Sequence, residues 1–402
     1  VGVLEARDGR MDLVRTRPDN DLVPLAAPAL EMPAWYVRHY DRHRARTLWS
    51  NVSMEPDFPT TAPLIAAYYS TTFGEPVDGV IAIDPFALER ILRATGPVPG
   101  PEGITFDEGN VARFVMSDSY ARFPDQTRRK TVVLEAAHVV FERLKTGVDA
   151  AALATALASA VRDKHVMVWM RSSAPQRALQ ALGADGRFGA PGRASIGVVT
   201  QNAAENKIDY YLRRTIRLEL RLRADGVADG TLRVRLDNLA PDAGLPRDVI
   251  GPITKPEGRG RDPSRFVAGL NVSWLNASLP PGALVLAWRV DGRAAASDQT
   301  AAPHAVISSL YLEVPSRAST EATLWFRLPP GPGWNGRRLA LLVPRQPTAA
   351  PDQVEIVVAA PDGRRLYPGG RREFAVRTAT NGDIPVDVVV RRPLWARFSD
   401  WL

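Results

Sequence analysis

Residues 55–98 read EPDFPTTAPLIAAYYSTTFGEPVDGVIAIDPFALERILRATGPV, and this stretch decides the fold of the first part of the chain. Two prolines fall near the start of a predicted helix over 59–72, where a missing backbone N–H costs no hydrogen bond. Val77–Ile83 is an apolar run of strand length. Asp84 and Pro85 then supply an N-cap and an N1 proline for the next helix. The stretch therefore predicts a helix–strand–helix unit.

The pattern of this unit extends over the first 190 residues, which alternate helix and strand signals. Two early strands, Val1–Ala6 and Met11–Thr16, flank Asp8-Gly9, a hairpin turn signal. The predicted helices cover residues 59–72, 85–95, 107–117, 126–145, 149–162 and 174–182. Together these signals predict an α/β domain over 1–190.

From Ala194 onward the sequence pattern is typical of a β protein, with short predicted strands between Gly, Pro and Asp-Gly turns. Residues 216–223 alternate apolar and charged side chains, which is typical of a strand with one buried face. The predicted strands cover 195–201, 209–224, 230–238, 284–290, 304–314, 321–328, 338–344, 353–359, 372–378 and 384–391. Strands at this spacing favour one or two antiparallel β-sandwiches.

The predicted architecture is therefore an α+β multidomain protein. The α/β domain over 1–190 is followed by a β-strand segment and linker over 191–265, whose part 241–266 is rich in Pro, Gly and Arg. An Ig-like β-sandwich over 266–402 completes the chain. Its last residues, 394–402, place Leu, Trp and Phe at helical spacing. They are predicted to dock on a protein partner or a membrane surface, or to pack back on their own domain.

Composition excludes several classes of function. The 402 residues contain no cysteine, which excludes thiol catalysis and disulfides, and no apolar run approaches the ~20 residues of a membrane span. The net charge is +7, and five of the 51 basic residues are lysines, so 46 are arginines. This arginine content indicates either GC-rich codon usage or attraction to anionic polymer or lipid phosphate. No nucleic-acid-binding motif, P-loop or dinucleotide fingerprint is visible, so neither a nucleic-acid partner nor a nucleotide is expected.

One candidate binding site opens the long helix over 126–145. Asp125, Arg128, Arg129 and Lys130 lie at its start, where cations oppose the helix dipole. Their presence there is explained if they hold a phosphate together with the free N–H groups of the first turn, because the arginine fork matches phosphate oxygens. The alternative is a solvated helix start with Asp125 as N-cap.

A second candidate is the loop after the early hairpin. Arg15 and Arg17 offer guanidinium groups for phosphate, and Asp19 offers a carboxylate for a divalent metal, which commonly binds one or two carboxylates plus substrate phosphate. The alternative is a solvated loop of mixed charge. Asp57 is either a substrate ligand or a turn anchor. Asp84 is predicted to cap its helix.

Several motifs occur in the order of a known family. Residues 56–62, 77–85 and 95–98, followed by 120–130 and 202–212, resemble the bacterial family of proteins of unknown function numbered 4012. The resemblance covers roughly residues 1–250. It implies an N-terminal membrane anchor outside this chain and an extracytoplasmic location in the cell envelope, but no activity.

A weaker resemblance does imply an activity. The order of elements is similar to the LytR–CpsA–Psr glycopolymer transferases, which move a glycan from a polyprenyl-pyrophosphate carrier to the cell wall. It implies that Arg17, Asp19 and Arg129 are catalytic and that Asp19 helps to hold magnesium or manganese. The residues that would bind substrate are Arg15, Asp57, Asp125, Arg128 and Lys130. Two departures stand out: the order Arg17-Pro18-Asp19 inverts the Pro-Arg-Asp of that family, and its first acidic element belongs upstream of Val1.

Two functions follow from these observations. The first is an extracytoplasmic, membrane-anchored envelope protein of actinobacterial type that binds a polyprenyl-linked glycan or cell-wall polymer and transfers it to the wall. The second is a non-catalytic surface scaffold or adhesin whose β domains bind glycans or proteins. The inverted loop and the large β region favour the second.

Overall fold

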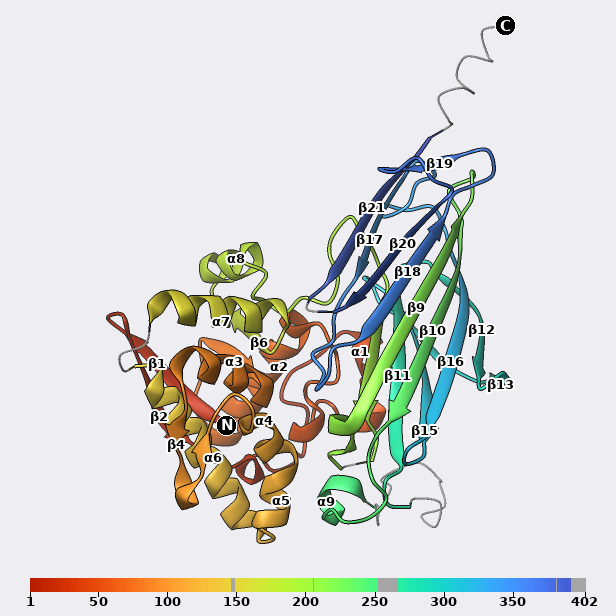
Figure 1. Ribbon diagram of the computed structural model, residues 1–402. Helices are drawn as coiled ribbons and strands as arrows, with labels where there is room; N and C mark the ends of the chain where they lie inside the picture. Colours follow the sequence, from red (N-terminus) through yellow and green to blue (C-terminus); the bar gives the residue numbers. More distant parts are fainter. Residues whose placement is uncertain (146–148, 205, 252–266, 381, 392–402) are drawn as a thin grey trace, which may run out of the picture. The chain divides into compact units, whose positions relative to one another are not determined.

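The computed structural model describes residues 1–145, 149–204, 206–251, 267–380 and 382–391. The chain forms two compact units, Val1–Arg187 and Phe188–Leu402. The first unit contains helices and short strands, and the second consists mainly of long strands (Figure 1). The mixed helix and strand content agrees with the predicted α+β class. The residues 394–402 of the predicted docking tail lie outside the described ones.

The helices of the first unit follow the sequence pattern closely. All six predicted helices are present, and the predicted helix over 107–117 is built from consecutive short segments. The helices are α1 (Ala34–Tyr40), α2 (Phe58–Phe73), α3 (Pro85–Thr95), α4 (Val111–Arg113), α5 (Ser119–Arg122), α6 (Gln126–Arg143), α7 (Ala150–Arg162) and α8 (Ser173–Ala181), with a π-helical turn at Phe114–Asp118 and 3₁₀ turns at Asp19–Asp21, Asp41–His43, Trp49–Asn51 and Pro101–Gly103. Asp84 caps α3 as predicted, since its Oδ1 accepts hydrogen bonds from Phe86 and Ala87 at 2.9 and 3.1 Å.

The strands of the first unit pair differently from a typical α/β domain. They are β1 (Gly2–Arg7), β2 (Arg10–Thr16), β3 (Gly79–Ile83), β4 (Val98–Pro99), β5 (Thr105–Phe106) and β6 (Val166–Met170). Among the described residues they form three two-stranded antiparallel sheets, β1–β2, β3–β6 and β4–β5. The α/β prediction is therefore corrected. Helices and strands do alternate along the chain, but β3 pairs antiparallel with β6, a strand that the sequence pattern missed.

The apolar stripe of α6 builds one core of this unit. Val132, Ala136 and Val140 are each at most 1% exposed and pack in one cluster with Leu92 of α3 and Phe106 of β5. Residues at three- and four-residue steps share a helix face, so this contact follows directly from the sequence period. Packing of α3 and α6 on the β4–β5 hairpin thereby fixes the direction of the start of α6.

The second unit is a β-sandwich with three sheets. Its strands are β7 (Ala194–Ser195), β8 (Gly197–Asn202), β9 (Leu212–Leu222), β10 (Ala228–Asn238), β11 (Asn271–Leu279), β12 (Leu284–Val290), β13 (Arg293–Ala295), β14 (Asp298–Ala301), β15 (Val306–Val314), β16 (Ser319–Leu328), β17 (Arg338–Val343), β18 (Gln353–Ala359), β19 (Arg365–Tyr367), β20 (Glu373–Ala379) and β21 (Ile384–Arg391), with a 3₁₀ turn at Ile208–Tyr211 and the short helix α9 (Arg247–Ile250). A seven-stranded sheet has the order β13-β12-β16-β10-β9-β18-β20. The two four-stranded sheets have the orders β14-β15-β11-β8 and β19-β21-β17-β7.

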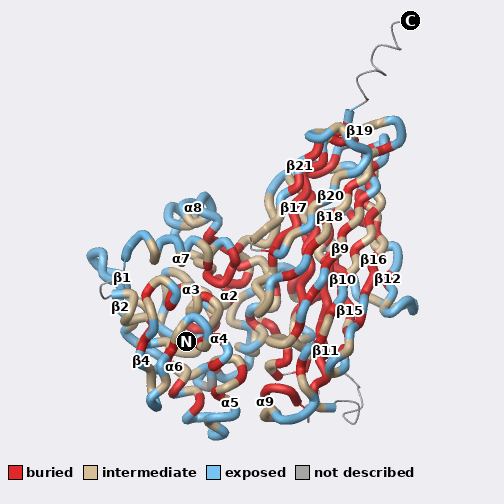
Figure 2. The backbone as a smooth tube through the Cα atoms, in the orientation of Figure 1, coloured by how far each residue is buried: buried red, intermediate tan, exposed pale blue. Residues whose placement is uncertain are grey.

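A single hydrophobic core joins the three sheets. It contains Leu218 of β9, Leu275 of β11 and Val388 of β21, together with many neighbours on the same strands. Buried and less buried residues alternate along β9 and β10, as Figure 2 shows, so each of these strands has one face in the core and one face towards solvent. The two central strands β9 and β18 run parallel, which departs from the predicted antiparallel sandwich.

The boundaries within the β region also differ from the prediction. Strands β9 and β10, predicted to belong to a separate segment over 191–265, pair with β18 and β16 of the predicted sandwich over 266–402. Both segments therefore belong to one unit, which begins at Phe188. The segment 241–266 was predicted as a linker, and its described part contains α9, whose Val249 and Ile250 are buried.

Candidate functional site

The loop that carries Arg15, Arg17 and Asp19 is positioned by the β1–β2 hairpin. Asp8 and Gly9 have φ values of 52° and 76°, the left-handed turn that a two-residue hairpin requires. A register shift between Val3 and Leu4 leaves Val14 as an extra residue on β2. The position of the loop therefore follows from the hairpin, whose turn is specified by Asp8 and Gly9.

Both arginines of the loop lie against the end of α2. Arg15 forms an ion pair with Glu75, and the Nη2 atom of Arg17 lies 3.9 Å from a carboxylate oxygen of the same residue. The guanidinium of Arg17 also lies 4.4 Å from the ring centroid of Phe73, a cation–π distance. Its Nε is buried and has no hydrogen-bond partner among the described residues. Arg17 thus combines a held orientation with an unused donor.

Asp19 connects this loop to α6. Its Oδ1 lies 2.6 Å from the Nζ of Lys130. Partial burial acts to raise the pKa of Asp19, but the hydrogen bond and charge of Lys130 outweigh it, so the pKa lies below its usual value. This contact therefore joins the two candidate sites predicted from the sequence, the loop after the hairpin and the start of the long helix.

The other residues at the start of α6 turn elsewhere. Asp125 is the N-cap, and its carboxylate accepts a hydrogen bond from the backbone N–H of Arg128 at 2.7 Å. The side chain of Arg128 forms an ion pair with Glu102. Arg129 is 7% exposed, lies 4.3 Å from the ring centroid of Tyr120 and donates to the carbonyl of Phe123 at 3.1 Å.

These positions show the surroundings of the residues to which the sequence assigned roles, and the roles themselves stay predictions. Arg129 was predicted to be catalytic, yet its guanidinium is engaged by the turn between α5 and α6 and faces the protein interior. Asp57, a predicted substrate ligand, occupies the N-cap position of α2 and accepts a hydrogen bond from the hydroxyl of Thr60 at 2.7 Å. Four of the predicted residues are connected by the loop and its contact with α6. We call these four the loop site: Arg15, Arg17, Asp19 and Lys130.

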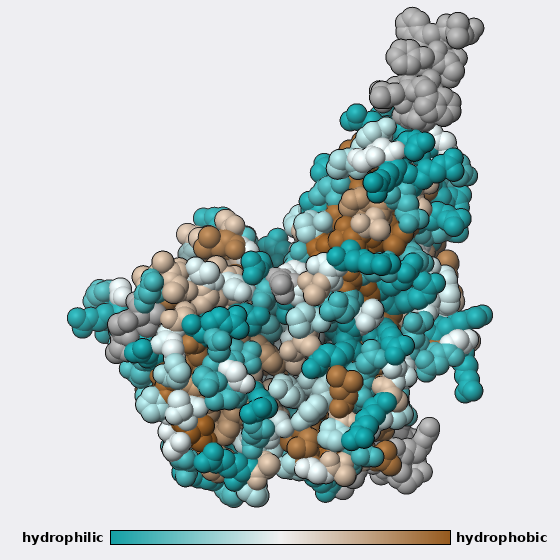
Figure 3. Space-filling model, in the orientation of Figure 1, coloured by the Kyte–Doolittle hydropathy of each residue, from teal (hydrophilic) through white to brown (hydrophobic). Residues whose placement is uncertain are grey.

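Apolar side chains accompany the loop site in the sequence. Met11, Val14 and Val23 are 51%, 50% and 56% exposed, although large apolar residues are usually buried. Met11 lies at the turn end of β2, Val14 directly precedes Arg15, and Val23 lies four residues after Asp19. Figure 3 shows hydrophobic side chains interspersed with hydrophilic ones on the visible face of this unit. A cationic loop flanked by exposed apolar residues can receive a ligand that is part phosphate and part hydrocarbon.

A metal site does not form from the residues present. In the described part of the chain, no group of three or more His, Cys, Asp or Glu side chains is placed to hold a metal ion. Asp19, the predicted ligand, is engaged by Lys130 instead. The donor set therefore does not fit magnesium or manganese as it stands, and no chemical step through a metal follows from it.

Sequence reasoning missed a buried carboxyl group before α2. Glu55 is 4% exposed and accepts a hydrogen bond from the hydroxyl of Tyr40 at 2.7 Å. Burial raises the pKa of Glu55 to about 7. The hydroxyl of the neighbouring Tyr36 is buried and has no hydrogen-bond partner among the described residues. The sequence contains little indication of this group. Tyr36 and Tyr40 lie on one face of α1, and that helix was not predicted.

Two further polar groups connect distant parts of the sequence. The Nδ1 of His165 lies 2.6 Å from the Oδ2 of Asp84. In the second unit, Asp209 accepts hydrogen bonds from Asn271 at 2.7 Å and Asn202 at 3.3 Å. Burial raises the pKa of Asp209 to about 6. Each of these groups has protein partners that account for its burial.

The fold defines a two-unit protein, in which a mainly helical unit carries the loop site and the second unit is a β-sandwich. Residues 1–120 match the profile of the family described as "Protein of unknown function (DUF4012)". This match confirms the first resemblance over part of the roughly 250 residues for which it was predicted. The resemblance to the LytR–CpsA–Psr transferases stays a prediction. No curated protein matches the sequence.

Solved structures resemble this chain only distantly. A Legionella pneumophila protein described as a candidate nutrient binding protein has a TM-score of 0.30 at 7% identity, with 49% of this chain and 70% of that chain covered. Leukotriene A4 hydrolase from Saccharomyces cerevisiae has a TM-score of 0.25 at 9% identity, with 44% and 29% covered. An M1 zinc metallopeptidase from Deinococcus radiodurans has a TM-score of 0.23 at 15% identity, with 45% and 39% covered. Similarities this low support no inference about fold or activity.

Among the residues that the structure describes, no helix combines the length and hydrophobicity needed to span a bilayer.

Proposed function

We propose that this chain is part of an extracytoplasmic cell-envelope protein whose first unit binds the phosphate groups of a polyprenyl-pyrophosphate-linked glycan at the loop site. The observation that carries the proposal is the state of Arg17. Its guanidinium is held against Phe73, while its Nε is buried without a partner among the described residues. Buried donors are nearly always hydrogen-bonded, so an unused one indicates a missing acceptor.

Phosphate suits this site better than a simple carboxylate ligand. Arg15 and Arg17 are both within reach of Glu75, and Lys130 adds a third cation through Asp19. Three cations against two carboxylates leave a net positive charge that a phosphate or pyrophosphate neutralises. The planar fork of arginine gives such a group two parallel hydrogen bonds.

A lipid carrier suits the surroundings of the site. The exposed side chains of Met11, Val14 and Val23 lose contact with water when a hydrocarbon chain covers them. Burial of apolar surface contributes roughly 25 cal/mol per Å². A polyprenyl phosphate offers both the anionic group and the hydrocarbon in one molecule.

Transfer of the glycan to the wall is the further step that the LytR–CpsA–Psr resemblance implies. The resemblance predicts Asp19 as a ligand of magnesium or manganese, although in the described structure its carboxylate is engaged by Lys130. We propose transfer as a prediction of the resemblance, together with an N-terminal membrane anchor. Binding is the part of the proposal to which the geometry contributes.

A binding measurement with matched lipids tests the proposal. The full chain is titrated with polyprenyl pyrophosphate and with the uncharged polyprenol, and complexes are counted by native mass spectrometry. We expect the pyrophosphate to bind, the polyprenol to bind at least ten times more weakly, and Arg15→Ala/Arg17→Ala to weaken pyrophosphate binding by tenfold or more. Arg113→Ala is the matched control, because Arg113 is an exposed ion-paired arginine of the same unit. Equal binding of both lipids, or an unaffected double variant, contradicts the proposal.

A second candidate function is a non-catalytic surface scaffold or adhesin. The engagement of Arg128 by Glu102 and of Arg129 by backbone carbonyls favours it, because these two side chains are then structural. In this reading the β unit contacts glycans or proteins and the first unit supports it. Native mass spectrometry separates the two, since the scaffold predicts stable assemblies without bound lipid.

A further inference from the structure

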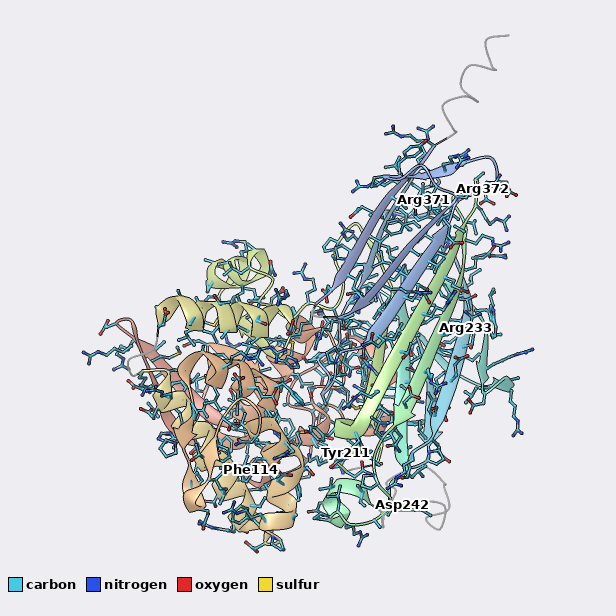
Figure 4. All side chains as sticks on the ribbon, in the orientation of Figure 1. Phe114, Tyr211, Arg233, Asp242, Arg371 and Arg372 are labelled. Atoms are coloured by element: carbon cyan, nitrogen blue, oxygen red, sulfur yellow. The ribbon has the colours of Figure 1, made fainter. Side chains whose placement is uncertain are left out.

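One end of the β unit carries a cluster of arginines without acidic partners. The six residues that we call the arginine tip come from four separate segments of the chain. They are Arg337, Arg364, Arg365, Arg371, Arg372 and Arg391. Among the described residues, none of them has a carboxylate within ion-pair distance. Figure 4 labels Arg371 and Arg372 at this end of the unit, near β19.

Strand pairing brings the segments of the tip together. Arg365 on β19 is the register partner of Arg391 on β21. The backbone N–H of Val390 donates to the carbonyl of Arg337 at 2.7 Å, and that of Leu366 donates to the carbonyl of Arg371 at 2.8 Å. Since Leu366 is 1% exposed, the hairpin that carries Arg371 is anchored in the core.

The hairpin turn orients these arginines through backbone hydrogen bonds. Gly369 and Gly370 have φ values of 114° and 62°, which side chains rarely tolerate, so the turn needs glycine at both positions. A guanidinium nitrogen of Arg365 donates to the carbonyl of Gly370 at 3.1 Å. Arg364 likewise donates to the carbonyl of Gly336 at 3.4 Å. These contacts fix the direction of the side chains without neutralising their charge.

The uncompensated charge carries a local cost. Like charges directly opposite each other on adjacent strands are destabilising, and this is the relation of Arg365 to Arg391. Two exposed carboxylates lie in the same region, Asp362 and Glu373, so the six arginines leave a net charge of +4. A cluster that is costly in the free protein is explained by an anionic partner that removes the repulsion.

We propose that the arginine tip docks on an anionic phospholipid surface and binds its head-group phosphates. Arg371, Arg372 and Arg391 are all exposed at this end of the sandwich, so an anionic surface can reach each of them. Arginine binds phosphate in a bidentate manner. Basic clusters near a membrane contribute about tenfold to thirtyfold in binding for each pair of arginines, and salt weakens the attraction.

An aromatic residue at the tip favours a lipid surface over a soluble polyanion. The ring centroid of Tyr367 lies 5.9 Å from the guanidinium carbon of Arg391, and Tyr367 is half-buried beneath the cluster. Tyrosine and tryptophan are enriched at membrane interfaces because one end of the side chain is apolar and the other polar.

Vesicle sedimentation with the full chain tests the proposal. The vesicles contain either phosphatidylcholine alone or phosphatidylcholine with 30% phosphatidylglycerol, and neither contains a polyprenyl lipid. We expect binding to the anionic vesicles at 0.1 M salt, little binding at 0.5 M salt and little binding to the neutral vesicles. Arg371→Gln/Arg372→Gln should lower the partition coefficient about thirtyfold, since each arginine near an anionic surface contributes roughly fivefold.

The matched control is Arg377→Gln on the outer face of the sheet. The side chain of Arg377 is 79% exposed, but it lies 2.6 Å from Glu355, so a carboxylate already balances part of its charge. This variant should change the partition coefficient by less than about twofold. Arg371→Lys/Arg372→Lys should keep most of the binding, because the charge is conserved. A near-ultraviolet circular dichroism spectrum identical to that of the parent protein shows that each variant is folded.

Three results overturn the proposal. The first is vesicle binding that Arg371→Gln/Arg372→Gln leaves unchanged, which places the contact elsewhere. The second is an equal loss in Arg377→Gln, which shows a general charge effect. The third is tip-dependent binding to soluble polyphosphate with no binding to anionic vesicles, which identifies a polyanion as the partner.

Discussion

The outer face of the seven-stranded sheet and the arginine tip belong to the same unit, but their arginines have different partners. On the sheet, Arg217 lies 2.7 Å from both Glu219 and Glu355, and Arg327 lies 2.7 Å from Asp229. At the tip, Arg371 and Arg372 have no such carboxylate among the described residues. Figure 4 shows Arg233 partway along the sheet and the tip residues at its end. The arginines of this unit therefore fall into two groups, those paired with carboxylates on the sheet and those without such partners at the tip.

The paired face follows from the register of the strands. Glu355 of β18 is opposite Arg217 of β9 on one side and Arg377 of β20 on the other. Side chains that face each other across strands lie close enough to interact. Cross-strand pairs of this kind balance charge locally and so reduce the attraction of the paired residues for a polyanion. Function is therefore expected where the pairing stops, at the tip and at the loop site.

The largest expected effect concerns a buried ion pair of the β unit. Arg214 and Asp352 lie 2.5 Å apart with side chains 2% and 5% exposed. Arg214→Met leaves Asp352 buried without its cation, and we expect the free energy of unfolding to fall by about 3–5 kcal/mol. Urea unfolding followed by tryptophan fluorescence measures this change.

The control for this prediction lies on the same strand. Arg217 of β9 has a side chain that is 40% exposed, and solvent screens exposed ion pairs, so Arg217→Met should lower the free energy of unfolding far less than Arg214→Met. Equal losses in the two variants would show that the contribution of these ion pairs to the free energy of unfolding does not depend on their burial.

The next effect concerns Glu55, whose pKa of about 7 lies above its unfolded value of 4.5. Because the folded state favours the protonated form, the contribution of Glu55 to stability is fully present below pH 4.5 and is lost as the pH rises through 7. We expect the first unit to lose about 2–3 kcal/mol over this interval. Glu55→Gln should flatten this part of the pH profile, since the amide stays neutral and still accepts a hydrogen bond from Tyr40. Thermal unfolding between pH 4.5 and 8 tests this, and a profile unchanged in the variant would assign the titration to another group.

A smaller effect is expected on the paired face. Glu355 has a side chain that is 18% exposed and serves both Arg217 and Arg377. Glu355→Gln leaves two arginines without their shared carboxylate, so we expect a loss of about 1 kcal/mol, which high salt reduces. Urea unfolding at 0.1 and 1 M salt measures both values. A loss that salt leaves unchanged would mean that packing, not charge, holds Glu355.

The smallest effect is expected at the tip. Arg371→Gln/Arg372→Gln removes charge that no carboxylate balances, so the stability of the free protein should stay within about 0.5 kcal/mol or rise slightly. Differential scanning calorimetry of the parent and variant gives the comparison. A clear destabilisation would show that these arginines serve the fold, and the contrast between tip and sheet would then be lost.

Local signals account for the parts of the fold that were predictable. The stripe of Val132, Ala136 and Val140, and the cap at Asp84, are encoded within a few residues. Strand β11 was missed because its Asn271, Ser273 and Asn276 suggest a solvated loop. These side chains are buried and bond to Asp209, to each other and to Ser309, and only the tertiary structure supplies those partners.

The candidate site shows the same limit. The contact of Asp19 with Lys130 joins the two charged groups that the sequence singled out. The diversion of Arg128 to Glu102 and of Arg129 to the carbonyl of Phe123 was not predictable, since both partners lie on turns whose placement depends on packing. The arginine tip could not be predicted from the sequence, because its residues come from four segments that only strand pairing brings together.

The contrast between paired and unpaired arginines can be measured residue by residue. The full chain is treated with the arginine reagent phenylglyoxal, and modification is followed by peptide mass spectrometry with and without anionic vesicles. Arg377 is the reference, because it is exposed but paired with Glu355. We predict that Arg371 and Arg372 react several times faster than Arg377 and are protected by vesicles containing phosphatidylglycerol. Equal rates at the three residues, or protection of Arg377 and not of the tip, would contradict the account.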